Sequence, residues 1–402
     1  VNTLYTNTSG SSNTALGRDA LFSNTTADSN VAVGYTALTA NTTGTLNTAV
    51  GVGSLDANTT GGSNNAFGLG ALGSNTTAST NNAFGLNALT DNLTGAGNTA
   101  MGHAALQDNL ANYNTAFGFL SMQLNTSGTG NAAFGYASLD ANTTGAENTA
   151  VGYASMSTNT TASNNTALGI SSLGLNTTGA GNTALGRLSL YNNTTAADNA
   201  AVGNSCLQNN TTGSQNIAMG TGALFATTTG AGNVAIGNVA GDALTTGSNN
   251  ICIGNTTDCS AVGAANQIVI GASITGGSNG QFTFGQGGNI VQNEFVTDAA
   301  WTRTSDRRKK RNIKEDDLGL GFINDLKTVT YQWRPSNEFP KEWDEYSEKN
   351  EQDTDVVMHG MIAQDIKKAL DKAGCDTFAG WSERTDGSQV MSREMFVMPL
   401  IK

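Results

Sequence analysis

Apolar and polar positions recur along the first two thirds of the chain with a period of 17 residues. Each unit reads Asn-Thr-Ala-Φ-Gly-x-x-Ala-Leu-x-x-Asn-Thr-Thr-Gly-x-x, where Φ is a large apolar residue. A glycine column marks the period, and its one short step, from Gly102 to Gly118, is 16 residues long. The column consists of Gly17, Gly34, Gly51, Gly68, Gly85, Gly102, Gly118, Gly135, Gly152, Gly169, Gly186, Gly203, Gly220, Gly237, Gly254 and Gly271. Such a period is typical of a solenoid, in which one small unit stacks on the next.

The apolar stretches within a unit are too short for helices, and the Gly, Asn and Thr around them are poor helix formers. We therefore predict short strands joined by turns, with the column glycine at a corner and Asn-Thr-Thr-Gly as a turn. Stacked coils place equal residues above one another, so the two Asn columns should form amide ladders. Phe67 and Phe84 should stack as one ring pair, and Phe117 and Phe134 as another.

The two faces of each predicted strand indicate an oligomer. Successive side chains point to opposite faces, so Φ lies on one face and the neighbouring Ala and Gly lie on the other. Neither face carries charge, whereas a sheet buried on one side only shows a polar second face. We therefore expect another chain against the coil, with the small Ala/Gly face in contact with it.

Charge divides the chain into two parts. Residues 1–304 contain three basic residues and no Lys, whereas residues 305–402 contain 16 basic and 19 acidic residues. We predict a repeat shaft at 1–271, a β connector at 272–304 and a separate domain at 305–402. Phosphate binding needs Lys and Arg, so the shaft is not expected to bind nucleic acid. Neutral polar ligands such as glycans suit it better. No apolar run is long enough to span a bilayer, so we expect no membrane insertion.

Cysteine and histidine are sparse. The four cysteines and two histidines show no zinc-site spacing, so we expect neither a metal nor another cofactor. Cys252 stands where other units have the small Ala, and a bridge from it to Cys259 stays open. Leu4 and Asn7 already occupy repeat positions, so we expect further protein upstream of Val1.

The repeats resemble the head repeats of trimeric autotransporter adhesins, in which Asn-x-Ala-Φ-Gly units build a trimeric parallel β-roll. The resemblance covers residues 1–271, including the closing Asn-Gln-Ile-Val-Ile-Gly at 266–271. Similar repeats also occur in bacteriophage fibres. The resemblance implies a mainly β homotrimer: a parallel β-roll or β-solenoid shaft of 17-residue repeats, followed here by a small α+β domain.

The segment Ser-Asp-Arg-Arg-Lys-Lys-Arg-Asn-Ile-Lys at 305–314 resembles the opening of the intramolecular chaperone domain at the C-terminus of phage endosialidases and tail fibres. Later segments fit the same family. A helix is predicted over 318–326, a strand over 329–333 and a strand-to-helix segment over 359–366. The residues from Met395 onward look like the start of a closing helix that the family extends, so the domain is predicted to be truncated there.

The second resemblance implies that this domain drives trimerisation and then cuts itself off between Ser305 and Asp306. Ser305 would be the nucleophile and Lys310 its base, with His359 as a further candidate. A serine hydroxyl needs a base to take its proton, and a lysine among other cations can serve because its pKa is lowered. The alternative is that this stretch is a solvated basic run. Any enzymatic activity would act once on the chain's own backbone and on no other substrate.

The functional prediction is a structural fibre or adhesin segment. We expect a bacteriophage tail fibre or virion spike for host attachment, assembled in the host cytoplasm and located on the virion or outside the cell. Its receptor would be a glycan or protein of the host surface. Two alternatives remain: the non-catalytic shaft of a larger polysaccharide depolymerase, or a bacterial surface adhesin. Ring side chains that could contact sugars are Tyr35, His103, Tyr113, Tyr153 and Tyr191.

Overall fold

A computed structural model of the protein describes residues 2–294, 311, 313–341, 343, 346–350, 354–384 and 387–401. The chain separates into two compact units, Val1–Thr304 and Ser305–Lys402, which are described in turn. Ser305, Asp306 and Lys310 lie outside the described residues.

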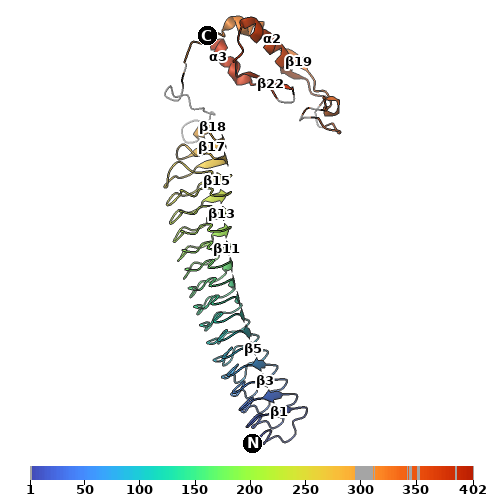
Figure 1. Cartoon of the computed structure of the whole chain (residues 1–402), viewed down its shortest axis with the longest axis vertical. Coiled ribbons are helices and arrows are strands. Elements are labelled where there is room, and N and C mark those ends of the chain that lie inside the picture. Colours follow the sequence, from blue (N-terminus) through green and yellow to red (C-terminus); the bar gives the residue numbers. More distant parts are fainter. Residues whose placement is uncertain are drawn as a thin grey trace. The chain divides into compact units, whose positions relative to one another are not determined.

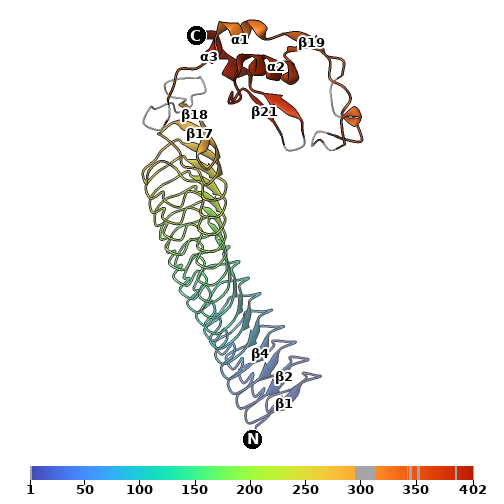
Figure 2. The same ribbon diagram turned by 45° about the horizontal axis from the view of Figure 1, so that its top comes forward.

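The first unit is a parallel β-solenoid with about one short strand per repeat (Figure 1). The strands of the repeats are β1 (Thr14–Leu16), β2 (Val31–Val33), β3 (Thr48–Val50), β4 (Asn65–Phe67), β5 (Asn82–Phe84), β6 (Thr99–Met101), β7 (Thr115–Phe117), β8 (Ala132–Phe134), β9 (Thr149–Val151), β10 (Thr166–Leu168), β11 (Thr183–Leu185), β12 (Ala200–Val202), β13 (Ile217–Met219), β14 (Val234–Ile236), β15 (Ile251–Ile253) and β16 (Ile268–Ala272). Each pairs in parallel with the strand of the next coil, and equal repeat positions face each other, as in Ala15 with Ala32. The mainly β solenoid predicted from the period is confirmed (Figure 2).

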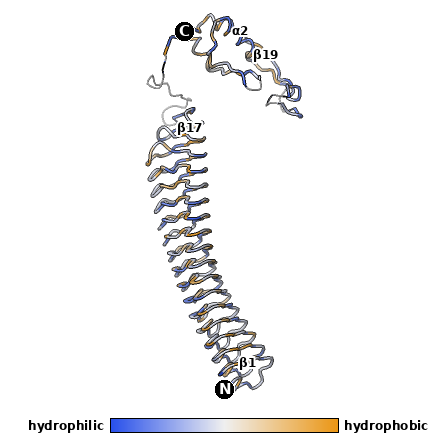
Figure 3. The backbone as a smooth tube through the Cα atoms, in the orientation of Figure 1, coloured by the Kyte–Doolittle hydropathy of each residue, from blue (hydrophilic) through white to orange (hydrophobic). Residues whose placement is uncertain are grey.

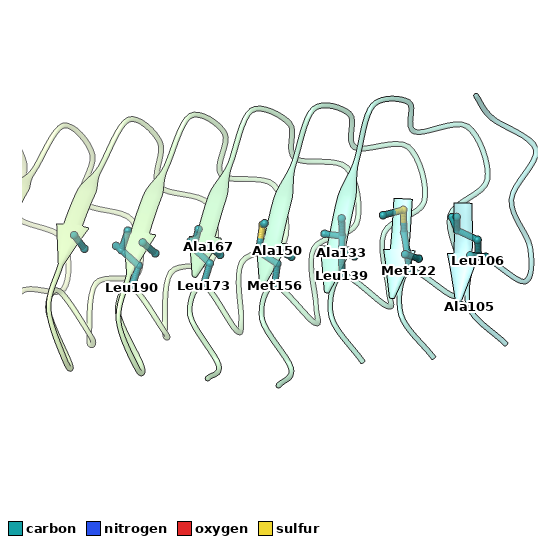
Figure 4. Close-up of a cluster of buried hydrophobic side chains, with 14 of the residues drawn as sticks. Ala105, Leu106, Met122, Ala133, Leu139, Ala150, Met156, Ala167, Leu173 and Leu190 are labelled. Carbon is teal, nitrogen blue, oxygen red and sulfur yellow. The ribbon is translucent and has the colours of Figure 1, made fainter. Parts of the chain in front are cut away.

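In the coils of β1 to β13 the core is the contact between the strand Ala and the Leu or Met six residues later (Figure 4). From Ala32 to Ala235 the strand alanines have 0% exposure in a single chain, and the Leu/Met column is equally buried. The expectation that the Ala/Gly face meets another chain is therefore wrong. The alanine points into its own coil, where a small side chain leaves room for the leucine opposite.

The corners of the coil use backbone conformations that are unusual for their residues. The column glycines have φ between 128° and 157°, a region that side chains with a Cβ rarely adopt. The core Leu/Met residues from Leu21 to Leu224 lie at φ between 49° and 53°. Left-handed leucines are disfavoured locally, so burial of the side chain must offset that strain.

Both asparagine columns form continuous buried ladders, as predicted. In the column that follows the leucine, Asn142 Nδ2 donates to Asn125 Oδ1 at 2.8 Å and to the Gly145 carbonyl at 2.9 Å, while Asn159 Nδ2 donates to Asn142 Oδ1 at 2.9 Å. In the column before the strand, the Asn47 backbone N–H donates to Asn30 Oδ1 at 3.0 Å. The ladders satisfy polar groups in the interior that would otherwise be costly to bury. Both predicted phenylalanine pairs also stack, with ring centroids 4.8 and 5.3 Å apart.

Exchanging one ladder amide for a carboxylate tests this network. Asn142→Asp removes the NH₂ donor and leaves a buried charge beside two carbonyl-type oxygens, so we expect a loss of about 3 kcal/mol or more in unfolding free energy at pH 8. The burial raises the pKa of the new carboxyl. The loss should therefore shrink as the pH falls below that pKa, because the protonated carboxyl can donate again. Urea unfolding followed by circular dichroism at pH 8 and pH 5 measures both effects.

Asn112→Asp is the matched control, because Asn112 is exposed and its Oδ1 accepts a bond from the Ala96 N–H that a carboxylate can also accept. Equal losses in the two variants would show that the buried donor is not needed.

The one short coil keeps its ladder. Asn109 Nδ2 donates to the Ala111 carbonyl at 2.8 Å, two residues onward, where regular coils reach a carbonyl three residues onward. Ala111 is buried, whereas Leu110 and Tyr113 are exposed. The asparagine turn is thus part of the interior. The coil is one residue shorter than the others, and the difference falls among the exposed residues around this turn.

The parallel sheet continues beyond the last full repeat. β17 (Gln281–Gln286) pairs in parallel with β16, and β18 (Asn289–Glu294) folds back antiparallel to β17. Both strands lie within the stretch predicted as a β connector. Figure 3 shows how apolar and polar segments repeat from coil to coil.

In the part of the chain that the structure covers, no helix combines the length and apolarity needed to cross a bilayer.

The second unit is a small α+β fold. Its elements are α1 (Leu320–Asp325), β19 (Val329–Tyr331), the 3-10 helix η2 (Ser336–Glu338), β20 (Met358–Gly360), α2 (Ala363–Ala373), β21 (Trp381–Glu383), β22 (Gln389–Met391), the 3-10 helix η3 (Arg393–Phe396) and α3 (Val397–Ile401). β19 pairs antiparallel with β20, and β21 with β22. The core holds Leu318, Phe322, Ile366, Leu370 and Phe396. The predicted helix, strand and strand-to-helix segments are confirmed, although α1 and β19 are shorter than predicted.

Candidate functional site

The outward face of the solenoid strands carries a continuous apolar stripe. It is formed by the Φ residues, which point away from the coil interior because they alternate with the buried alanines. Each is half-buried or exposed in the single chain. The outward stripe consists of Leu16, Val33, Val50, Phe67, Phe84, Met101, Phe117, Phe134, Val151, Leu168, Leu185, Val202, Met219, Ile236, Ile253 and Ile270.

Residues two places before Φ share this outward face and are also uncharged. They are Thr, Asn, Ala, Val or Ile, as in Thr166 of β10 and Ile217 of β13. An uncharged, largely apolar surface that runs along the whole sheet exceeds the scattered apolar residues of an ordinary monomer surface. Chemically, it suits contact with another protein surface of the same kind.

A column of rings lies beside the stripe, one residue after the column glycine. His103, Phe119, Tyr136 and Tyr153 stack in sequence with centroid separations of 4.9, 5.4 and 5.1 Å and interplanar angles of 13°, 4° and 8°. Within such a stack the ring faces cover one another and the edges remain outward. Sugars pack on free ring faces, so the inner rings of this column are poorly disposed for that contact. Tyr113, outside the column, is 72% exposed.

Variation in residue size within each column is a sequence signal for the outward face, and the prediction that the Ala/Gly face meets another chain did not use it. The Ala column scarcely changes along the repeats, whereas Φ changes from Val50 to Phe67 in adjacent coils. A closely packed interior does not absorb such volume changes without strain. This variation favours the Φ column as the outer one, and the closure of the coil decides it.

The structure does not place the predicted cleavage site, since Ser305, Asp306 and Lys310 lie outside the described residues. It does place His359, in the middle of β20, where it is exposed and opposite Thr330 of β19. A shallow depression beside it is lined by Val329, Gly360 and Met361. The relation of His359 to the predicted nucleophile and base lies outside the described residues, so the proposed catalytic set stays a prediction.

Metal binding gains no support from the described side chains. Among them, no group of three or more His, Cys, Asp or Glu residues is arranged to hold a metal ion.

Comparison with known families identifies the start of the second unit. Residues 305–375 match the family described as chaperone of endosialidase. Neither the curated proteins nor the solved structures gave a match to this chain. The matched range begins at Ser305 and includes α1, β19, β20 and α2. The chain thus joins a parallel β-solenoid of 17-residue repeats to a C-terminal segment that matches the chaperone-of-endosialidase family, an architecture that fits a trimerising segment of a fibre or tail spike.

Proposed function

We propose that this chain is the shaft of a homotrimeric bacteriophage tail fibre or virion spike that attaches to a glycan or protein of the host surface. In this proposal the segment after Ser305 brings three chains together and is then released by cleavage between Ser305 and Asp306. The protein works on the virion, outside the cell, after assembly in the host cytoplasm.

The outward stripe is the observation that carries the proposal. Every coil leaves one large apolar side chain on the outer face of its strand, so the stripe extends from Leu16 to Ile270. Burial of apolar surface is worth about 25 cal/mol per Å², and repetition over the whole shaft makes the total large. Three parallel copies around one axis would cover the stripe in each of them.

Equal repeats create a problem of register that a chaperone segment would solve. Two chains can slip by one whole repeat and still place the same residue types against each other, at little local cost. A C-terminal segment that trimerises first would start all three chains at the same coil. Its removal would then make unfolding of the trimer kinetically difficult, because the starter segment is gone.

A charge on the outward stripe tests the trimer. Leu168→Glu places three like charges at one level of the proposed interface, and we expect the trimer to lose several kcal/mol of stability. Sedimentation equilibrium over a range of protein and urea concentrations measures the loss. Leu175→Glu is the matched control: both leucines belong to the same coil and both are exposed, at 49% and 37%, but only Leu168 is on the strand face.

The control variant should remain within about 1 kcal/mol of the unmodified protein, since an exposed substitution away from an interface has little effect. A monomeric unmodified chain at micromolar concentration would refute the proposed trimer. Equal losses in both variants would place the interface elsewhere.

A further inference from the structure

Two buried cysteines meet inside the coil that contains β15. Cys252 is the middle residue of β15, where it replaces the inward alanine and lies between Ala235 and Val269 of the adjacent strands. Cys259 follows the next corner and belongs to the same buried core as the leucine column. Their exposures are 0% and 4%, and the two Sγ atoms are 3.0 Å apart.

The pair stands where the earlier coils have an apolar contact. In the coils of β1 to β13 a strand alanine packs against a leucine or methionine six residues later, as Ala150 does with Met156 in Figure 4. In this coil Cys252 faces Cys259 instead, and Thr257 Oγ1 at the corner between them donates to the Gly271 carbonyl at 2.9 Å. Cys259 lies one residue beyond the usual leucine position, which Asp258 occupies here, so a thiol fills the interior space that the leucine fills in earlier coils.

We infer that Cys252 and Cys259 form an intramolecular disulfide when the protein meets a peroxide, and that this bond locks the coil of β15 near the end of the repeats. A disulfide bond is about 2.05 Å long, so a movement of about 1 Å brings the two sulfur atoms to bonding distance. The inference depends neither on the trimer nor on cleavage at Ser305, because both cysteines belong to the solenoid of one chain.

The oxidation is balanced with hydrogen peroxide. The sulfur of Cys259, the more exposed of the two, takes one oxygen atom to become a sulfenic acid, and the first water is released. The sulfur of Cys252 then attacks the sulfur of Cys259, the S–S bond forms, and the hydroxyl leaves with a proton as the second water. The two sulfur atoms lose two electrons in all, and peroxide is reduced to two waters.

The surroundings of the pair make this reaction slow. The neighbouring Cys259 thiol, and after it burial, raise the pKa of Cys252. Burial, and then the adjacent Asp242 carboxyl, raise the pKa of Asp258 to about 6. Thiolate is the reactive form, so the raised pKa of Cys252 slows its attack on the sulfenic acid. The expected behaviour is a stable lock and not a rapidly cycling redox centre.

Peptide mapping can test the inference directly, because Asp258 separates the two cysteines. A protease that cuts before aspartate places Cys252 on peptide 242–257 and Cys259 on peptide 258–297. After treatment of the whole protein with hydrogen peroxide and alkylation in denaturant, we expect the two peptides to appear joined. Their joint mass should be about 2 Da below the sum of the two, since two hydrogens are lost. Dithiothreitol should separate them.

Two variants serve as controls. Cys252→Ala restores the residue that the other coils carry and should abolish the joined peptides without unfolding the solenoid, which circular dichroism checks. Cys206→Ala removes a buried cysteine three coils earlier, whose peptide 198–241 is separate, and should leave the joined pair unchanged. The inference fails if peroxide leaves both cysteines open to alkylation, converts them to unlinked sulfinic acids, or links either of them to Cys206 or Cys375.

Discussion

Gly135→Ala is expected to disrupt the solenoid at its middle, with a loss of about 4 kcal/mol or more in local stability. A Cβ at this position would overlap the carbonyl oxygen of Gly152 in the next coil and lie 2.7 Å from its carbonyl carbon. Gly135 also has a φ of 139°, which alanine rarely adopts. The obstacle is backbone held in a parallel ladder, so no side-chain rotation can relieve it. Thermal unfolding and limited proteolysis measure the loss, and new cleavage should appear near the altered coil.

Gly288→Ala is the matched control, because a Cβ there would meet nothing within 4 Å. It should leave the melting temperature nearly unchanged. If Gly135→Ala is as stable as Gly288→Ala, adjacent coils do not approach as closely at the glycine corner as the structure indicates.

Ser305→Ala is expected to keep the chain whole, while the unmodified chain separates into fragments of 305 and 97 residues. The expectation follows from the family resemblance, in which Ser305 attacks and Lys310 takes its proton. Alanine has no nucleophile, so cleavage should fall below detection. A denaturing gel sampled over a prolonged incubation of the purified protein gives the result, and the mass of the smaller fragment locates the cut.

Two neighbouring lysines provide the control for the role of the base. Lys310→Arg keeps the charge but replaces a lysine that can lose its proton by a guanidinium that cannot, so cleavage should stop. Lys309→Arg changes the same residue type one place earlier and should leave cleavage intact. An unmodified chain that stays at full length, or a Ser305→Ala chain that is cut, would contradict the proposed self-cleavage.

The repeat made most of the solenoid predictable. A period of 17 residues with one apolar residue at constant phase leaves few options other than stacked coils. Stacking then dictates that like residues meet, which is why the Asn142 ladder and the stacked pair Phe67–Phe84 could be anticipated. The same reasoning reached the second unit only through short segments. There, the predicted strand at 329–333 is two residues too long, because β19 ends at Tyr331.

The chemistry proposed for Ser305 remains a matter of sequence resemblance, because the described residues do not include it. A linear motif gives the order of nucleophile and base but not the distance between them. His359 illustrates the difference: it is the exposed middle residue of β20, and its order in the chain says nothing about which groups it approaches.

The sequence pattern alone established that the chain is a stack of like coils and which residues share a column, because a constant period carries that information directly. It could not establish which strand face is inside. Alternation is symmetrical, so both Ala150 and Val151 were compatible with the interior until the direction of coil closure was known. Closure depends on left-handed corners such as Met156, with a φ of 50°, a conformation that local preferences disfavour and that only packing of the whole coil supports. Tertiary structure therefore decided that the alanines close the core and that the large apolar residues face outward.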